Sequence, residues 1–226
     1  VCDGAPAAFP PLAANPQVYR RTVILLACAV EEEIAFWQPR AGVETLVMGV
    51  GPVEAASAIA AALAARRYGL VVNAGLGGAF DGAAQIGDGV VIAEDAMEIS
   101  LEDGTPLNLP RGERTVEEAR SEPSLVAGLR AKGFSVLRGI TVARVTSTEG
   151  TARRLAASRG AQVESMEGFA VLRSAQRAGV PAIELRGISN RCGARESSGW
   201  DFAAGIAGLA RISNALLDLC DGIKDV

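Results

Sequence analysis

The stretch that decides the fold is TVILLACAV, residues Thr22 to Val30. It is continuously apolar and partly β-branched, which is typical of a central strand covered on both faces. Three glutamates, Glu31 to Glu33, follow at once and are expected to begin a helix. A buried strand that leads straight into a helix is the unit from which α/β folds are built.

This unit repeats along the chain. Apolar runs predict further strands, and tight glycine turns or an early proline mark the helices between them. The expected strands cover 45–50, 70–73, 90–94, 134–142, a short segment around 163, and 182–188, and the expected helices cover 52–67, 123–132, a segment from 151, 167–178 and 201–219. Alternation this regular predicts one α/β domain over residues 21–226, with a mixed or mainly parallel sheet.

Residues 1–20 differ from the rest. Pro6, Pro10, Pro11 and Pro16 lie among alanines without a helical or strand period, so we interpret this segment as a flexible leader or a packed arm.

Composition narrows the class of protein. The chain has 226 residues, 49% of them hydrophobic, which is enough for one domain with a sizeable core. The formal charge is -4 and no lysine or arginine run is long enough to follow a phosphate backbone, so we expect no nucleic-acid partner. We see neither a secretory signal nor an apolar stretch near the roughly 20 residues that cross a bilayer, and we expect a cytoplasmic protein without a membrane partner.

The reactive residue types are few. The four cysteines are far apart and form no CxxC pair, so we expect free, mostly buried thiols and no zinc site. There is no histidine, which removes the Ser-His-Asp and Cys-His nucleophile systems and the usual metal ligands. Catalysis must therefore rest on carboxylates, amides and backbone groups.

Three polar clusters follow predicted strands, where open α/β sheets bind ligands: Glu31–Glu33, Met166–Gly168 and Ser189–Arg191. The glutamates can equally be a solvated first helical turn, favoured by the helix dipole. The turn Gly49-Val50-Gly51 suggests a dinucleotide site only weakly, because Glu54 stands where the third glycine is expected.

Taken together, these pieces resemble the purine nucleoside phosphorylase and nucleosidase superfamily over nearly the whole chain. The matching pieces are Ala29–Glu33, Gly49–Gly51, Asn73–Gly78, Gly87-Asp88, Val163–Gly168 and Arg186–Asn190. The resemblance implies a three-layer α/β/α nucleoside phosphorylase-like fold with a mixed central sheet, no metal or organic cofactor, a small-molecule nucleoside substrate, and a homodimer or larger homo-oligomer.

Within the superfamily, Ile188–Gly193 followed by Gly199-Trp200-Asp201 is most similar to futalosine hydrolases. That similarity implies hydrolysis of the N-glycosidic bond of futalosine, which releases hypoxanthine and dehypoxanthine futalosine in menaquinone biosynthesis. The alternatives are a methylthioadenosine/adenosylhomocysteine nucleosidase, a purine nucleoside phosphorylase acting on inosine, and a nucleoside-binding protein without catalysis.

The resemblance assigns roles to three residues. Glu33 matches the glutamate that activates water, and Glu167 with Met166 matches the residues that hold the ribose. Simpler interpretations remain open: a surface turn for Glu33, a helix-dipole partner for Glu167 and a core side chain for Met166.

Asn190 and Leu76 depart from related patterns. Adenine-specific members carry an aspartate at the position of Asn190, whereas an amide can donate to a 6-oxo group while its carbonyl receives an N7 proton. Phosphorolytic members commonly place a hydroxyl residue at the position of Leu76, so leucine favours water as the nucleophile. An Asn after a strand can also form a turn with its own backbone.

Further substrate contacts are expected from six residues: Gly77, Gly78, Ser189, Thr148, Trp200 and Arg191. The stretch Thr146-Ser147-Thr148 lies where the family lines its base pocket, but it lacks the aromatic expected there. Futalosine carries a benzoate on the 5′ side of its sugar, so a cation is expected, with Arg191, Arg195 and Arg144 as candidates. Trp200 can equally be a core or lid residue.

Overall fold

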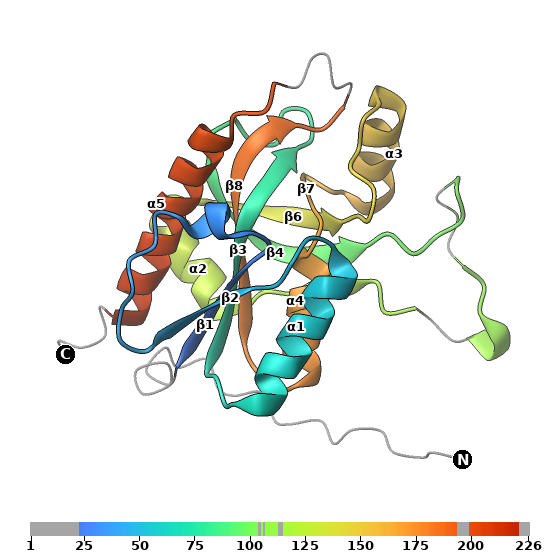
Figure 1. Ribbon diagram of the computed structural model, residues 1–226. Coiled ribbons are helices and arrows are strands. Elements are labelled where there is room, and N and C mark those ends of the chain that lie inside the picture. The colour runs from blue at the N-terminus through green and yellow to red at the C-terminus, as the bar shows by residue number, and fades with distance from the viewer. Residues whose placement is uncertain (1–22, 104, 106, 113–114, 194–198, 222–226) are drawn as a thin grey trace.

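The computed structural model of the protein describes residues 23–103, 105, 107–112, 115–193 and 199–221 (Figure 1). The interpretation of residues 1–20 as a leader or arm falls outside this range, and so does Arg195.

The sheet is mixed, as expected, but it also closes on itself. Its strands are β1 Ile24–Cys28, β2 Val43–Val47, β3 Leu70–Ala79, β4 Gly89–Met97, β5 Glu118–Arg120, β6 Ser135–Thr141, β7 Val163–Ser165 and β8 Ala182–Arg191. Their order is β2-β1-β3-β7-β6-β4-β5, and β8 pairs with both β3 and β4. The strands β3, β8, β4, β6 and β7 therefore pair in a closed ring. Outside the ring, β3 also pairs with β1, which in turn pairs with β2.

Helices cover both faces, which confirms the three-layer arrangement. The helices are α1 Pro52–Ala65, α2 Pro123–Ala131, α3 Glu149–Arg159, α4 Gly168–Arg177 and α5 Phe202–Asp221, and short 3-10 turns lie at η2 Glu31–Ile34 and η3 Pro110–Gly112. In Figure 1, α5 and α2 lie on one side of β1 and β3, and α1 and α4 lie on the other.

The first strand shows why the chain folds this way. Leu26 and Cys28 of β1 face the cluster formed with α2 and α5, whereas Leu25 and Ala27 face the cluster formed with α1 and α4. Side chains alternate across a strand, so an unbroken apolar run is what a strand buried on both faces requires. The prediction for this segment is confirmed.

Three local expectations were wrong. The glycines Gly75, Gly77 and Gly78, expected in a turn, belong to β3, which runs on to Ala79 because β7 and β8 pair with its far half. Ser189–Arg191, expected after a strand, form the end of β8. The helix expected at Glu31 is a single 3-10 turn of four residues.

The last helix packs as expected along most of its length. Leu209, Ile212 and Leu216 are buried against the sheet. Phe202, the first residue of the same helix, is 54% exposed. Contrary to expectation, Phe202–Cys220 is apolar and long enough to cross a bilayer. Its buried residues belong to the core cluster that covers the sheet, so core packing accounts for its apolar character.

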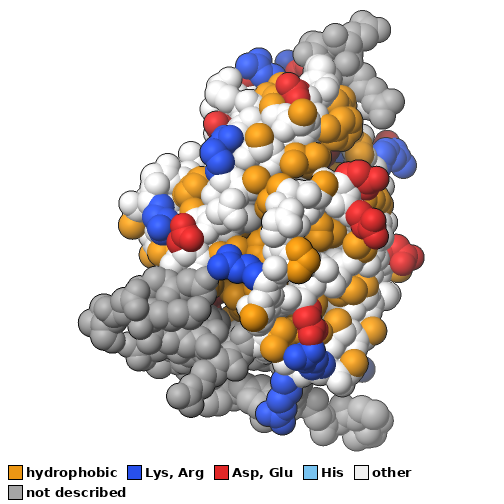
Figure 2. Space-filling model, turned by 60° about the vertical axis from the view of Figure 1, so that its left-hand side comes forward, with side chains coloured by type: hydrophobic (Ala, Val, Ile, Leu, Met, Phe, Trp, Pro, Cys, Tyr) orange, Lys and Arg blue, Asp and Glu red, His pale blue; other side chains and the backbone are white. Residues whose placement is uncertain are grey.

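Charged groups are scattered over the face shown in Figure 2, and acidic and basic side chains alternate there without a broad basic stripe. Cys28, Cys192 and Cys220 are buried and form no disulfide with one another, as expected. Burial raises the pKa of Cys28 to about 12, so this thiol is a core side chain rather than a nucleophile.

Candidate active site

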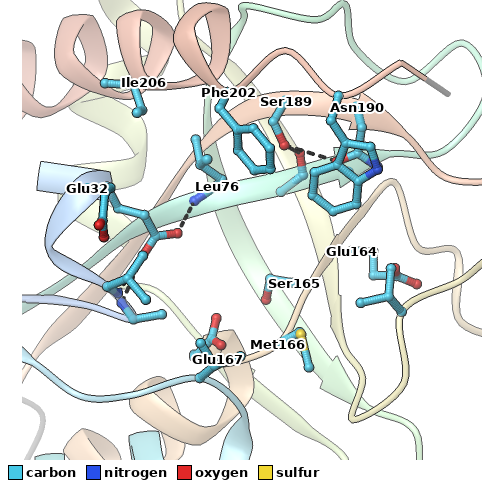
Figure 3. A pocket seen from close by; sticks show the side chains of 18 residues that line it. Glu32, Leu76, Glu164, Ser165, Met166, Glu167, Ser189, Asn190, Phe202 and Ile206 are labelled. Atoms are coloured by element: carbon cyan, nitrogen blue, oxygen red, sulfur yellow. Dashed lines mark hydrogen bonds between the residues drawn. The ribbon is translucent and has the colours of Figure 1, made fainter.

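A cavity of about 540 Å³ lies where β1, β3, β7 and β8 end (Figure 3). Its wall is formed by Ala29, Val30, Glu32 and Glu33 after β1, Val50 before α1, Leu76 to Gly78 of β3, Val145, Glu164 to Glu167 at the β7–α4 junction, Ser189 and Asn190 of β8, and Trp200, Phe202 and Ile206 at the start of α5. Segments distant in the sequence therefore meet at one edge of the sheet, as the position of the three polar clusters predicted.

Glu33 is the most firmly held carboxylate of this wall. One oxygen, Oε2, accepts hydrogen bonds from the Ala29 N–H at 2.8 Å and the Val30 N–H at 3.4 Å. The other, Oε1, accepts from the Leu76 N–H at 2.7 Å. Glu33 is 7% exposed, and burial raises its pKa although these donors oppose the shift. A fixed, desolvated carboxylate with a raised pKa has the properties of a general base.

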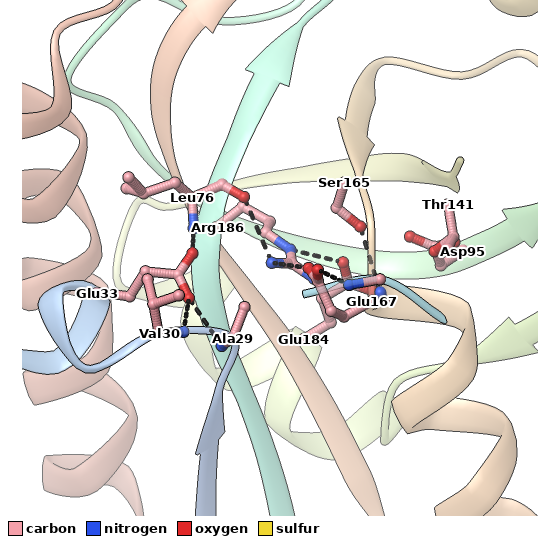
Figure 4. Close-up of polar contacts among 12 residues, drawn as sticks. Ala29, Val30, Glu33, Leu76, Asp95, Thr141, Ser165, Glu167, Glu184 and Arg186 are labelled. Carbon is pink, nitrogen blue, oxygen red and sulfur yellow. Dashed lines mark hydrogen bonds and ion pairs between the residues drawn. The ribbon is translucent and has the colours of Figure 1, made fainter. Parts of the chain in front are cut away.

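Glu167 lies on the opposite side of a shared guanidinium. Its Oε1 accepts from the Gly51 N–H at 2.9 Å, and its Oε2 lies 3.9 Å from Nη1 of Arg186. Figure 4 shows Arg186 between Glu33 and Glu167, and its Nη1 also donates to the Leu76 carbonyl at 3.4 Å. Arg186 is 1% exposed, so it supports the site from beneath and does not reach a ligand in the cavity.

Behind Arg186 lie two more carboxyl groups. Nε of Arg186 donates to Glu184 at 2.9 Å, and Asp95 accepts from the Thr141 hydroxyl at 2.8 Å. Neither Asp95 Oδ2 nor Glu184 Oε2 has a donor among the described residues, and both residues are fully buried. Burial and repulsion by Glu184 raise the pKa of Asp95 well above its ordinary range, and burial raises the pKa of Glu184.

Asn190 reaches the cavity because the end of β8 is irregular. The register of β3 with β8 shifts between Gly77 and Gly78, which sets Asn190 opposite Gly78. A Cβ at Gly78 would lie 2.8 Å from Nδ2 of Asn190, so glycine there makes room for the amide. The Ser189 hydroxyl donates to Asn190 Oδ1 at 3.0 Å, and Nδ2 donates to the Arg191 carbonyl at 3.2 Å.

Aromatic side chains stand at the other end of the wall. Trp200 and Phe202 are 44% and 54% exposed, and their ring centroids are 5.3 Å apart. Figure 3 shows Phe202 beside Ser189. The exposure of Trp200 and its place on the cavity wall do not fit a core residue.

The sequence of the chain matches a known family. A family model described as "Phosphorylase superfamily" matches residues 35–220. The chain belongs to the phosphorylase superfamily. A futalosine hydrolase from Streptomyces coelicolor is 39% identical over 198 residues, which are 81% of this chain and 82% of that protein. A futalosine hydrolase from Thermus thermophilus is 35% identical over 76% of this chain and 80% of that protein.

Solved structures of the superfamily share the fold. A 5′-methylthioadenosine/S-adenosylhomocysteine nucleosidase from Helicobacter pylori has a TM-score of 0.74 and 17% identity over 87% of this chain and 98% of that chain. The corresponding nucleosidase from Colwellia psychrerythraea, in complex with adenine, has a TM-score of 0.70 and 21% identity over 89% of this chain and 95% of that chain.

For this superfamily member, most of the residues singled out in the sequence lie on the cavity wall. They are Glu33, Asn190, Glu167, Met166, Gly77, Gly78, Ser189 and Trp200. Thr148 and Arg191 do not belong to the wall. Thr148 is exposed and caps α3, where its hydroxyl accepts from the Thr151 N–H at 3.2 Å. Arg191, the last residue of β8, is exposed because its side chain alternates away from that of Asn190.

Of the three candidate cations, Arg144 and Arg191 do not line this cavity, and Arg195 lies outside the described residues. Arg144 lines a separate hollow of about 530 Å³ beside α3. Among the described residues, the wall of the first cavity contains no lysine or arginine, and no group of acidic or thiol side chains is suited to holding a metal ion.

Sequence reasoning gave no individual role to several wall residues. In the sequence, Glu164 stands out only as part of the motif Val163–Gly168, and Phe202 only as part of the helix expected over 201–219. Its position inside a short predicted strand could have drawn attention to Glu164, because an acidic side chain is rarely buried unless it is paired.

Proposed function

We propose that this protein hydrolyses the N-glycosidic bond of futalosine and releases hypoxanthine and dehypoxanthine futalosine. The observation that carries the proposal is one cavity with Glu33 and Glu167 at one end and an amide, Asn190, at the other (Figures 3 and 4). The identity to two futalosine hydrolases over about four-fifths of their length supports the same substrate.

Glu33 activates the attacking water. The three backbone N–H groups fix its carboxylate, and its desolvated state makes it a stronger base than an exposed glutamate. Water attacks C1′ of the ribose as the C1′–N9 bond breaks through an oxocarbenium-like transition state, and its proton passes to Glu33.

Asn190 assists departure of the base. Its Oδ1 accepts one hydrogen bond from Ser189 and its Nδ2 gives one to the Arg191 carbonyl, which leaves one lone pair and one N–H for a ligand. The free N–H donates to O6 of hypoxanthine. N7 of the departing base takes a proton from solvent, and the Asn190 carbonyl then accepts a hydrogen bond from this N7–H. Adenine carries a 6-amino group in place of O6, so its N–H would face the free N–H of Asn190 and the two donors could not bond.

Glu167 and Met166 hold the sugar between these two ends. Glu167 has one oxygen on the Gly51 N–H and the other near Arg186, so its remaining lone pairs can accept from the ribose hydroxyls. Met166 is half-buried on the cavity wall and packs against the ring. Gly77, Gly78 and Ser189 border the base.

Several features favour water over phosphate as the nucleophile. The Leu76 N–H, the backbone donor in the glycine-rich segment, is already used by Glu33. Four carboxylates, Glu32, Glu33, Glu164 and Glu167, line the cavity, and no cation among the described wall residues offsets them. A phosphate dianion would be repelled here.

Trp200 and Phe202 form an apolar slot for the benzoate on the 5′ side. These two aromatic side chains on the cavity wall, whose rings are tilted by 32° to one another, provide the apolar surface that a substituted phenyl ring requires. The further expectations belong to this proposal as well: a role in menaquinone biosynthesis, a cytoplasmic location and a homo-oligomer.

The proposal is tested by incubating the purified protein with futalosine, inosine or methylthioadenosine, each with and without phosphate, and measuring the free base by chromatography. Phosphate-independent release of hypoxanthine from futalosine is the expected result. Release only in the presence of phosphate would show a phosphorylase, adenine release alone would show the adenine nucleosidase, and no release from any substrate would leave a binding protein.

A further inference from the structure

Glu164 is a buried carboxylate in the cavity wall to which the mechanism above gives no part. It is 6% exposed and lies on β7. Its Oε1 accepts from the Thr146 N–H at 3.0 Å, and its Oε2 accepts from the Thr146 hydroxyl. Each oxygen keeps a second lone pair, and the residue borders the cavity.

No cation compensates this charge among the described residues. The ion pairs found there do not include Glu164, and burial and the negative charge of Glu98 both raise its pKa, although its bonds to Thr146 oppose the shift. A buried carboxylate without a cation is unfavourable unless donors satisfy it, and Thr146 supplies only two. A site that retains such a group has free acceptor capacity for a donor that arrives with the ligand.

The sheet places Glu164 beside Asn190. Gly78 pairs with Glu164 of β7 on one side and with Asn190 of β8 on the other. Residues directly opposite on neighbouring strands share a face, and neighbouring strands lie about 4.8 Å apart. Because Gly78 has no side chain, the Asn190 amide and the Cys192 thiol occupy the space above it, and Figure 3 shows Glu164 and Asn190 at the same end of the cavity.

We propose that Glu164 accepts a hydrogen bond from N1–H of the 6-oxopurine, while Asn190 donates to the adjacent O6. An N1–H next to a carbonyl distinguishes hypoxanthine from adenine, whose unprotonated N1 is an acceptor. The pair would thus read both atoms of the lactam edge. This inference rests on the proposed function, which supplies the 6-oxopurine.

The test compares binding of hypoxanthine and 1-methylhypoxanthine by titration calorimetry, because methylation removes the N1 donor and leaves O6 and N7. The wild-type protein is expected to bind 1-methylhypoxanthine about 10- to 100-fold more weakly, the range for a hydrogen bond to a charged group plus the added methyl. In Glu164→Gln this ratio should fall, because the amide keeps an acceptor for N1–H but loses the negative charge that strengthens the bond. Glu32→Gln, which removes a carboxylate from the same wall, should keep it.

Equal binding of both bases by the wild-type protein would overturn the inference without any variant, and so would an unchanged ratio in a folded Glu164→Gln protein. Futalosine turnover by the wild-type protein is measured in parallel. Discrimination at N1 without turnover would contradict the proposed function alone, whereas turnover without discrimination would contradict the role of Glu164 alone.

Discussion

The backbone N–H of Leu76 donates a 2.7 Å hydrogen bond to Oε1 of Glu33, which joins the middle of β3 to the turn after β1. The bond holds the carboxylate at the cavity wall and at the same time occupies a donor of the glycine-rich segment. In the proposed mechanism, this hydrogen bond orients the general base, Glu33. It also occupies a backbone N–H that could otherwise donate to a phosphate.

Replacing this base should nearly abolish turnover. We expect Glu33→Gln to lower kcat with futalosine by about 10²- to 10⁴-fold, because general base catalysis contributes that much. Glu31→Gln is the matched control, since Glu31 is exposed and does not line the cavity. Single-turnover release of hypoxanthine measures both, and more than a tenth of wild-type activity in Glu33→Gln would remove Glu33 from the mechanism.

The pH profile should report the burial of Glu33. Burial raises the pKa of this carboxyl, and a general base works only when ionised. Activity should therefore fall as the pH decreases through a value above about 4.3, the ordinary pKa of an exposed glutamate. An acid limb of kcat at or below that ordinary value would contradict the assignment.

Replacing the Asn190 amide with a carboxylic acid should shift the preference of the site from hypoxanthine towards adenine. In Asn190→Asp, an oxygen replaces the Nδ2 that donates to the Arg191 carbonyl at 3.2 Å and leaves no N–H for O6. We expect the ratio of kcat/KM for futalosine to that for methylthioadenosine to fall by at least about tenfold, the effect of one hydrogen bond. Asn190→Ser tests the opposite case, because loss of the amide without gain of an acid should lower both values.

The packing of α4 against the buried carboxyls should tolerate no methyl group. A Cβ at Gly168 would overlap both Asp95 and Glu184, and the backbone φ there is not in the left-handed region. We expect Gly168→Ala to lower the free energy of unfolding by about 1–3 kcal/mol through overpacking.

Gly150→Ala is the control for that substitution. Gly150 lies in α3 with nothing within 4 Å of its added Cβ, so alanine should be neutral or stabilise by up to about 1 kcal/mol. Urea denaturation distinguishes the two variants, and equal stability of both would show that the carboxyls can move aside.

The raised pKa values of Asp95 and Glu184 should make stability depend on pH. Because both are raised in the folded state, the stability they contribute is present below the unfolded pKa and is lost as the pH rises through the folded value. Asp95→Asn keeps an acceptor for the Thr141 hydroxyl and removes one of the two titrating carboxyls. Thermal unfolding between pH 4 and 9 should show a smaller loss of stability in the variant, and parallel curves for the two proteins would show that Asp95 does not set the pH dependence.

Much of this molecule follows from the sequence alone. The apolar run from Ile24 to Cys28 is buried on both faces, and the alternation of strands and helices produced the three layers. Glu33, Glu167 and Asn190 could be selected because each belongs to a polar cluster near the end of a predicted strand and to a motif of the superfamily. The strands β1 and β8 run parallel to β3, whereas β7, which leads to Glu167, is antiparallel to it.

Other features needed the tertiary structure. Pairing of β8 with both β3 and β4 closes the sheet. Because β7 and β8 pair with the far half of β3, its glycines belong to a strand, and Glu164 and Asn190 both lie opposite Gly78. Local sequence carries no information about such partners, because the strands that pair are far apart in the chain. The sequence determined which groups the site contains, and the register of β3 with its neighbours decided which of them face one another across the cavity.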